Sequence, residues 1–194
     1  MQPLFILHIS FEKNVDMKYR FLIALCFLFS MQSKAQEKNS SPVIPEADGF
    51  VVIKGAKIQP DRNRIYKAIY DATKAPKEPS QILPAINMAG SELNALAVCN
   101  IPVTHAKFVV VFHGAAIYGI LDNFHYKEKY GIDNPNLKVF SELRKAGVQL
   151  FVCGQNLLAE NIELKTISPD VIVASDALIV LMTYQNNGYS LMSF

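Results

Sequence analysis

The chain has 194 residues, of which 51% are hydrophobic and 19% are charged, and its formal net charge at pH 7 is +2. This apolar content excludes a disordered chain, because it is enough to build the packed core of one domain. The small net charge, without a block of Lys and Arg, argues against a nucleic-acid partner, and three cysteines are too few for a disulfide scaffold.

The first 35 residues have the pattern of a secretory signal peptide. Lys18 and Arg20 precede an unbroken apolar run over residues 21–29, and the segment ends in Ser33-Lys34-Ala35. A helix of this run rises about 14 Å, which is short of the ~30 Å core of a membrane. We therefore expect cleavage after residue 35, with Met17 as an alternative start. The product would be periplasmic or secreted, without stable membrane insertion; an N-terminal core helix is the competing interpretation.

Residues 36–60 are predicted to be a flexible polar lead-in with one candidate short strand at Phe50–Ile53, and the domain follows over residues 61–194. The domain begins with a predicted strand over Ile65–Ala72. A helix is predicted from Ile82 onward, because apolar residues recur there at spacings of four and three. Pro84 fits the first turn of this helix, where a backbone N–H would have no partner.

Three later runs are apolar without alternation: Phe108–Phe112, Val148–Val152 and Val171–Ala174. Strands that are buried on both faces have this composition, and they occur in parallel sheets that helices cover. The alternation of strands and helices, with short connections, predicts an α/β fold. We expect three layers, an α/β/α sandwich around a parallel sheet.

Two further helices have clear ends in the sequence. One has Asn134 as its N-cap and Pro135 in its first turn, and it stops at Gly147. The other is capped at Asp176 and runs to Asn187, and a last strand follows it. Its residues 178–182 are apolar all round, which is typical of a helix buried on two sides. Either this helix lies deep within the chain or it contacts another subunit.

Two reactive side chains directly follow predicted parallel strands: His113 and Cys153. Ligands of parallel α/β sheets bind outside the carboxyl ends of the strands. Gly154-Gln155-Asn156 leads from Cys153 into a predicted short helix, and N–H groups near a helix start favour a thiolate. Cys153 is therefore a candidate nucleophile. His113 could assist it, bind a metal with it or hydrogen-bond the turn. An inert core cysteine is the competing interpretation.

Other chemistry has little support in the sequence. Cys99 ends the helix before the strand at residues 108–112, so it should lie roughly 20 Å from Cys153, whereas a disulfide needs Cα atoms within about 7 Å. One His and one Cys fall short of a structural zinc site, and His105 and His125 show no ligand spacing. Nucleotide-binding glycine motifs and the Gly-x-Ser-x-Gly elbow are absent, so no cofactor is expected.

Four segments together resemble the DsrE/DsrF-like (YchN-like) family: Phe108–Gly114, Asn134–Asn136, Lys145–Gln155 and Ser175–Tyr189. The similarity covers about residues 65–194. The resemblance implies a five-stranded parallel sheet between helical layers and assembly into homotrimers or homohexamers. The better-understood relatives are cytoplasmic sulfur-relay proteins that carry a persulfide on a cysteine, and here Cys153 is the position that matches.

Two functions follow as alternatives. The first is a sulfur carrier or sulfur transferase, in which the Cys153 thiolate accepts sulfane sulfur from a thiol or persulfide partner and His113 tunes its protonation. The second is a non-catalytic oligomeric periplasmic protein that binds a small ligand or a metal. A carrier needs an exposed thiol, whereas a binding protein can bury it. The candidate binding residues are Gly114, Gly154, Gln155, Asn156 and Gln185.

Overall fold

The computed structural model describes residues 40–193. The predicted signal peptide and its cleavage site lie outside these residues. Within residues 40–193, none of the helices has the length and apolarity that a membrane crossing requires.

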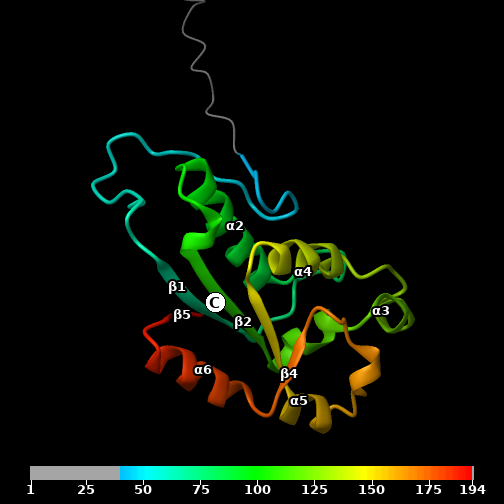
Figure 1. The fold of residues 1–194 in the computed structure, drawn as a ribbon. Coiled ribbons are helices and arrows are strands. Elements are labelled where there is room, and N and C mark those ends of the chain that lie inside the picture. Colours follow the sequence, from blue (N-terminus) through cyan, green and yellow to red (C-terminus); the bar gives the residue numbers. More distant parts are fainter. Residues whose placement is uncertain (1–39, 194) are drawn as a thin grey trace, which may run out of the picture. The chain divides into compact units, whose positions relative to one another are not determined.

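Five strands form one parallel sheet (Figure 1). The strands are β1 (Tyr66–Ala72), β2 (Ala106–Phe112), β3 (Gln149–Cys153), β4 (Ile172–Ala174) and β5 (Ser190–Ser193). They lie in the order β4-β3-β2-β1-β5, and every neighbouring pair is parallel. The predicted five-stranded parallel sheet is therefore confirmed.

Helices cover both faces of this sheet, as predicted for a three-layer sandwich. α2 (Pro84–Val98) and α4 (Asn136–Lys145) lie on one side and α6 (Ala177–Asn186) lies on the other (Figure 1). The shorter elements are α3 (Asn123–Tyr130), α5 (Gly154–Ala159) and the 3-10 helices η1 (Val103–His105), η2 (Gly114–Ile120) and η3 (Leu164–Thr166).

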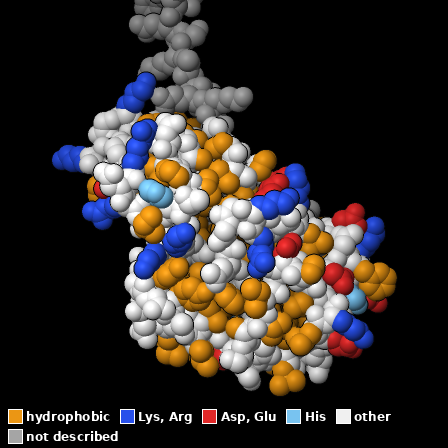
Figure 2. Space-filling view, in the orientation of Figure 1, with side chains coloured by type: hydrophobic (Ala, Val, Ile, Leu, Met, Phe, Trp, Pro, Cys, Tyr) orange, Lys and Arg blue, Asp and Glu red, His pale blue; other side chains and the backbone are white. Residues whose placement is uncertain are grey.

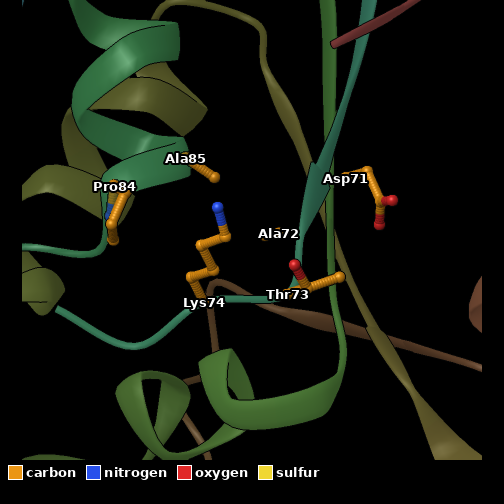
Figure 3. A pocket seen from close by; sticks show the side chains of 6 residues that line it. All are labelled: Asp71, Ala72, Thr73, Lys74, Pro84 and Ala85. Atoms are coloured by element: carbon orange, nitrogen blue, oxygen red, sulfur yellow. The ribbon is translucent and has the colours of Figure 1, made fainter. Parts of the chain in front are cut away.

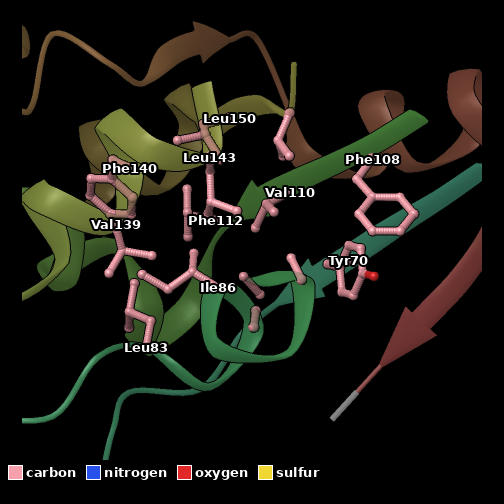
Figure 4. Close-up of a cluster of buried hydrophobic side chains, with 14 of the residues drawn as sticks. Tyr70, Leu83, Ile86, Phe108, Val110, Phe112, Val139, Phe140, Leu143 and Leu150 are labelled. Carbon is pink, nitrogen blue, oxygen red and sulfur yellow. The ribbon is translucent and has the colours of Figure 1, made fainter. Parts of the chain in front are cut away.

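We call the side of the sheet under α2 and α4 the closed face. Because strand side chains alternate, every second residue of each strand points to it. Figure 4 shows Tyr70 of β1 and Val110 of β2 packed there with Leu143 of α4, in the larger of two buried clusters. Pro84 occupies the first turn of α2, as the sequence predicts.

We call the side under α6 the open face, because a smaller cluster covers it. Ile69 of β1, Val109 and Val111 of β2 and Cys153 of β3 pack against α6 there. The residues of α6 that are buried in this cluster are Ala177, Val180 and Leu181. The faces therefore differ in how many helices they carry.

The predicted helix ends are close to the observed ones. α4 begins at Asn136 with Pro135 in the N-cap position, one residue later than predicted. Asn134 precedes this cap, and its Oδ1 accepts the Asn136 N–H at 2.9 Å. Gly147 follows α4 with φ of +89°, the left-handed backbone that favours glycine. Asp176 caps α6, because its Oδ1 accepts the N–H of Leu178 at 2.6 Å.

The outer side of α6 is exposed within the single chain. Leu178, Ile179 and Met182 keep 59%, 52% and 55% of their surface accessible. The interpretation of this helix as lying deep within the chain is therefore wrong, since only one of its sides is covered. A contact with another subunit stays a prediction.

Residues 40–50, which we call the strap, pack against α2 in place of the expected flexible lead-in. Ile44 is fully buried, and Ala47 lies over Gly90 of α2, where an added Cβ would come within 2.5 Å of the Ala47 Cβ. The candidate short strand at Phe50–Ile53 does not form, and Phe50 makes only a single bridge to Ser40. The polar composition of this segment did not predict the packing, because Ile44 and Ala47 are the only buried side chains within the strap.

One buried side chain of α2, Asn94, holds the strap in place. Its Oδ1 accepts the N–H groups of Val43 and Ile44 at 2.9 Å each. Its Nδ2 donates to the carbonyl oxygens of Ile44 at 3.0 Å and Asp48 at 3.1 Å. Four hydrogen bonds from one amide thus satisfy backbone groups that a strap without secondary structure would leave unpaired.

Candidate functional site

Three polar or reactive side chains gather on the open face at the carboxyl edge of the sheet: Asp71, His113 and Cys153. Asp71 lies near the end of β1, His113 follows β2 and Cys153 ends β3. Phe112 of β2 pairs with Val152 of β3, so the next residues on the two strands, His113 and Cys153, are neighbours. Neighbouring strands lie about 4.8 Å apart. Asp71 is level with Val111, two residues before His113, so the three residues lie diagonally across three adjacent strands.

The imidazole of His113 is hydrogen-bonded to the Asp71 carboxylate, with Nε2 and Oδ1 2.5 Å apart. The two side chains are 20% and 19% exposed. The backbone of His113 is still extended, and its N–H donates to the carbonyl oxygen of Ala72 at 3.0 Å. Both partners are therefore held by the sheet, and they remain accessible from solvent.

A sharp turn after β2 places η2 beside the site. Gly114 has φ of +56°, and a Cβ there would lie 3.2 Å from the carbonyl oxygen of Thr73. The Gly114 N–H donates to Oδ1 of Asn156 at 3.1 Å, which joins the turn after β2 to α5 after β3. Gly114 and Asn156, both predicted binding residues, thus connect the two turns that carry His113 and Cys153.

Cys153 is buried, with 4% of its surface exposed. It occupies the N-cap position of α5 and belongs to the buried cluster that includes Ala177 of α6. Gly154, the next residue, lies close to β4, because a Cβ added to it would lie 2.8 Å from the Ala174 carbonyl oxygen. Among the residues that the structure describes, His113 is bonded to Asp71 and makes no hydrogen bond to Cys153. A reagent therefore has limited access to this thiol.

The structure separates the two predicted glutamines. Gln155 is exposed at the site, and its Nε2 donates to the Ser175 carbonyl oxygen at 3.4 Å. Gln185 lies in the last turn of α6, roughly 12 Å along the helix from Ala177. That end of α6 lies near the start of β1, where Lys67 donates to the Asn187 carbonyl oxygen. Gln185 is therefore at the opposite edge of the sheet and does not belong to this site.

A shallow hollow lies behind the end of β1, lined by Asp71, Ala72, Thr73, Lys74, Pro84 and Ala85. Figure 3 shows the Lys74 amine pointing toward Ala85, whereas the Asp71 carboxyl points to the other side of β1. The hollow therefore belongs to the closed face, and the Asp71–His113 pair belongs to the open face.

The remaining cysteine and histidines are separate from the site. Cys99 is free and ends α2, near the edge of the sheet where β2 begins, opposite Cys153. His105 lies in η1, and His125 lies in α3, where its Nδ1 contacts Asp122 at 2.8 Å. Both lie in helical turns. Residues 40–193 contain no group of three or more side chains suited to hold a metal ion.

Asp71 is the site residue that the sequence reasoning missed. It stands in the segment Ile69–Ala72 as the one charge near the end of an otherwise apolar strand. A carboxylate next to the carboxyl end of a parallel strand has the same positional signal that pointed to His113 and Cys153. That signal would have found it.

Comparison with known proteins gives one family and two similar structures. The model of the DsrE/DsrF-like family matches residues 65–194, which include all five strands and all three site residues. The chain is similar to a protein of unknown function, MTH1491 from Methanobacterium thermoautotrophicum, with 13% identity and a TM-score of 0.49, over 66% of this chain and 99% of that one. It is also similar to the ychN protein from E. coli, with 14% identity and a TM-score of 0.46, over 66% and 99% of the two chains. No curated protein matches it.

Proposed function

The chain belongs to the DsrE/DsrF-like family, which is linked to sulfur relay, and from that premise we propose that it carries sulfane sulfur on Cys153. One observation supports the proposal above the others. The sheet register puts His113 beside Cys153, and His113 is already bonded to the Asp71 carboxylate. A thiol next to an imidazole that a third group orients is the arrangement that activates a cysteine nucleophile.

The transfer proceeds as an exchange between a thiol and a persulfide. The Cys153 thiol gives its proton to His113, and the thiolate attacks the outer sulfur of a donor persulfide, R–S–SH. A bond forms between Sγ and that sulfur while the donor S–S bond breaks. The donor leaves as RS⁻ and takes the proton from the His113 imidazolium. Cys153 is then a persulfide and the donor is a thiol, so no external oxidant or reductant is consumed.

Burial sets a condition on this reaction. Cys153 is 4% exposed in the cluster that α6 covers, whereas the side chain of His113 next to it is 20% exposed. The donor sulfur therefore arrives from the His113 side, and the first turn of α6 has to yield to admit it. A short loop leads into that turn from β4. Slow, selective reaction with small persulfides is the expected behaviour.

The open face also supports self-association, which we propose as a homotrimer or homohexamer. The exposed apolar side chains on this face come from α6 and from both edge strands: Ile172, Leu178, Ile179, Met182 and Leu191. Figure 2 shows hydrophobic side chains gathered over the lower part of the molecule, where Figure 1 places α5 and α6. Exposed apolar side chains gathered on one face are typical of a protein–protein contact.

Export is part of the same proposal. The charged residues, the apolar run and the small-x-small sequence before Gln36 support secretion with removal of residues 1–35. N-terminal sequencing of the secreted protein should then begin at Gln36. Retention of the first 35 residues by a cytoplasmic protein would contradict it.

The second candidate function, a non-catalytic ligand-binding protein, is favoured by the burial of Cys153 and by its lack of a hydrogen bond to His113 in the described chain. In that case half-buried His113 and exposed Gln155 contact the ligand. Cys153 then only fills space under α6.

Alkylation kinetics separate the two functions. In a Cys99→Ser background, the processed protein keeps Cys153 as its one thiol, and intact mass follows its reaction with iodoacetamide or with a small persulfide donor. A carrier is alkylated while folded and gains the mass of one sulfur atom from the donor. A cysteine that reacts only after unfolding, with no sulfur uptake, would exclude the carrier and leave the binding protein.

A further inference from the structure

We propose that Asp71 is a positioning residue that fixes the tautomer of His113, with the proton on Nε2 and the free lone pair on Nδ1. The inference rests on the proposed function, because it gives the His113 imidazole its role toward Cys153. It adds a residue and a specific nitrogen atom to the site.

The hydrogen bond between the two side chains determines the tautomer. An ionised carboxylate can only accept hydrogen bonds, so the nitrogen 2.5 Å from Oδ1 of Asp71 carries the proton. A neutral imidazole carries one N–H, and Nδ1 therefore has the lone pair that accepts the thiol proton, directly or through a bridging water. With the opposite tautomer, Nε2 and the carboxylate would face each other without a proton between them.

Both partners are anchored by backbone on rigid elements. Asp71 lies inside the sheet, paired with Val111 of β2 on one side and Ser193 of β5 on the other. His113 is tied to β1 through its own N–H and the Ala72 carbonyl oxygen. A functional pair on neighbouring strands is held more accurately than one on loops.

The charged and titratable groups that accompany His113 at this edge of the sheet come from four places. Asp71 is on β1, and Lys74 lines the hollow behind it. Cys153 ends β3, and Asp176 caps the helix that covers Cys153. Asp71 is the one group among these that is bonded to the imidazole, so the positive charge that His113 gains with the thiol proton is stabilised mainly there.

The test compares Asp71→Asn with the parent, in the Cys99→Ser background. The control variant is Asp61→Asn, a carboxylate in the exposed loop before β1. Nitrogen-15 NMR of histidine-labelled protein reports which ring nitrogen of His113 is protonated, and His113→Gln assigns the signal. Iodoacetamide rates between pH 5 and 9 report the reactivity of Cys153.

We expect His113 to be protonated at Nε2 in the parent and in Asp61→Asn, and to be a mixture of tautomers in Asp71→Asn. Alkylation of Cys153 at pH 7 should slow at least about tenfold in Asp71→Asn, and its pH profile should move to higher pH. Unchanged melting temperatures would show that the fold is intact.

Results that contradict the role of Asp71 differ from results that contradict the sulfur-carrier function. A parent His113 protonated at Nδ1 overturns the inference about Asp71, whatever Cys153 does. A tautomer that Asp71→Asn leaves unchanged overturns it as well. If the tautomer depends on Asp71 while Cys153 takes up no sulfur, the positioning role stands and the sulfur-carrier function fails.

Discussion

The closed and open faces of the sheet are made of the same five strands, but different amounts of chain cover them. On the closed face α2, α4 and the strap bury a continuous cluster, in which the rings of Phe112 and Phe140 pack edge to face at 5.5 Å. On the open face α6 alone supplies three buried side chains, and its outer side is bare.

The difference shows that the residues important for stability and the residues of the site lie on opposite faces of one sheet. A side chain buried among close-packed neighbours cannot move without loss of contacts, so the closed face suits stability. The site residues Asp71, His113 and Cys153 all point to the open face, which one long helix covers. The face with the thinner cover is also the one with exposed apolar surface, so the site and the proposed subunit contact lie on the same side.

A matched pair of leucine substitutions should show the largest difference between the faces. Leu143 on the closed face is fully buried, whereas Leu178 on the outer side of α6 is 59% exposed. We expect Leu143→Ala to lower the free energy of unfolding by about 2–5 kcal/mol, because it leaves a cavity. Leu178→Ala should lower it by less than about 0.5 kcal/mol in dilute, monomeric protein. Urea titrations measure both, and equal effects would contradict the distinction between the faces.

The strap should contribute the next largest effect. Asn94→Ala removes the four hydrogen bonds that Asn94 makes to the strap backbone and leaves buried polar groups without partners. The expected loss is about 2–3 kcal/mol, with faster proteolysis within residues 40–50. Asn87→Ala is the control, since Asn87 bonds Asp48 at an exposed position and should lose less than about 1 kcal/mol. A strap that is cleaved no faster in Asn94→Ala would show that Asn94 does not hold it.

A charge on the outer side of α6 should change assembly rather than folding. Met182→Lys places an ammonium group on the exposed apolar surface, and we expect the subunit dissociation constant to rise at least about tenfold. Thr104→Lys, on the exposed η1 helix, is the control and should leave assembly unchanged. Light scattering over a dilution series measures both. A parent that is monomeric at every concentration would refute the proposed contact.

The smallest expected effect lies at the rim of the closed face, where Glu142 of α4 meets Glu46 of the strap. Burial, followed by the hydrogen bond with Glu46, raises the pKa of Glu142 above its ordinary value, and Lys138 opposes this only in part. Because the folded protein favours protonated Glu142, this stabilisation is complete below about pH 4.5 and is lost as the pH rises through the raised pKa.

Glu142→Gln should therefore be more stable than the parent near pH 7, by less than about 1 kcal/mol, and should lose this advantage near pH 4. Glu163→Gln is the control, because its exposed pair with Lys165 lowers the pKa of Glu163 and should not produce a gain at neutral pH. Thermal melts of the parent and both variants across this pH range measure the gain in stability. A gain that is the same at pH 4 and pH 7 would show that it does not come from ionisation.

Local patterns in the sequence determined the strands, the main helices and the two residues that follow β2 and β3. Continuous apolar runs and capping residues are properties of short segments, so β1–β5, α2, α4 and α6 could be predicted within a few residues. Placing His113 and Cys153 at one edge needed only the general rule for parallel sheets.

Only the tertiary structure decided which residues of different elements lie next to one another. The register between β1 and β2 brought Asp71 to His113, and the antiparallel course of α6 carried Gln185 to the far edge. Whether α6 is covered on one side or two, and whether a polar strap packs on Asn94, also depends on segments far apart in the chain. Side-chain alternation and helical periodicity describe one element at a time, whereas a site is a set of contacts between elements.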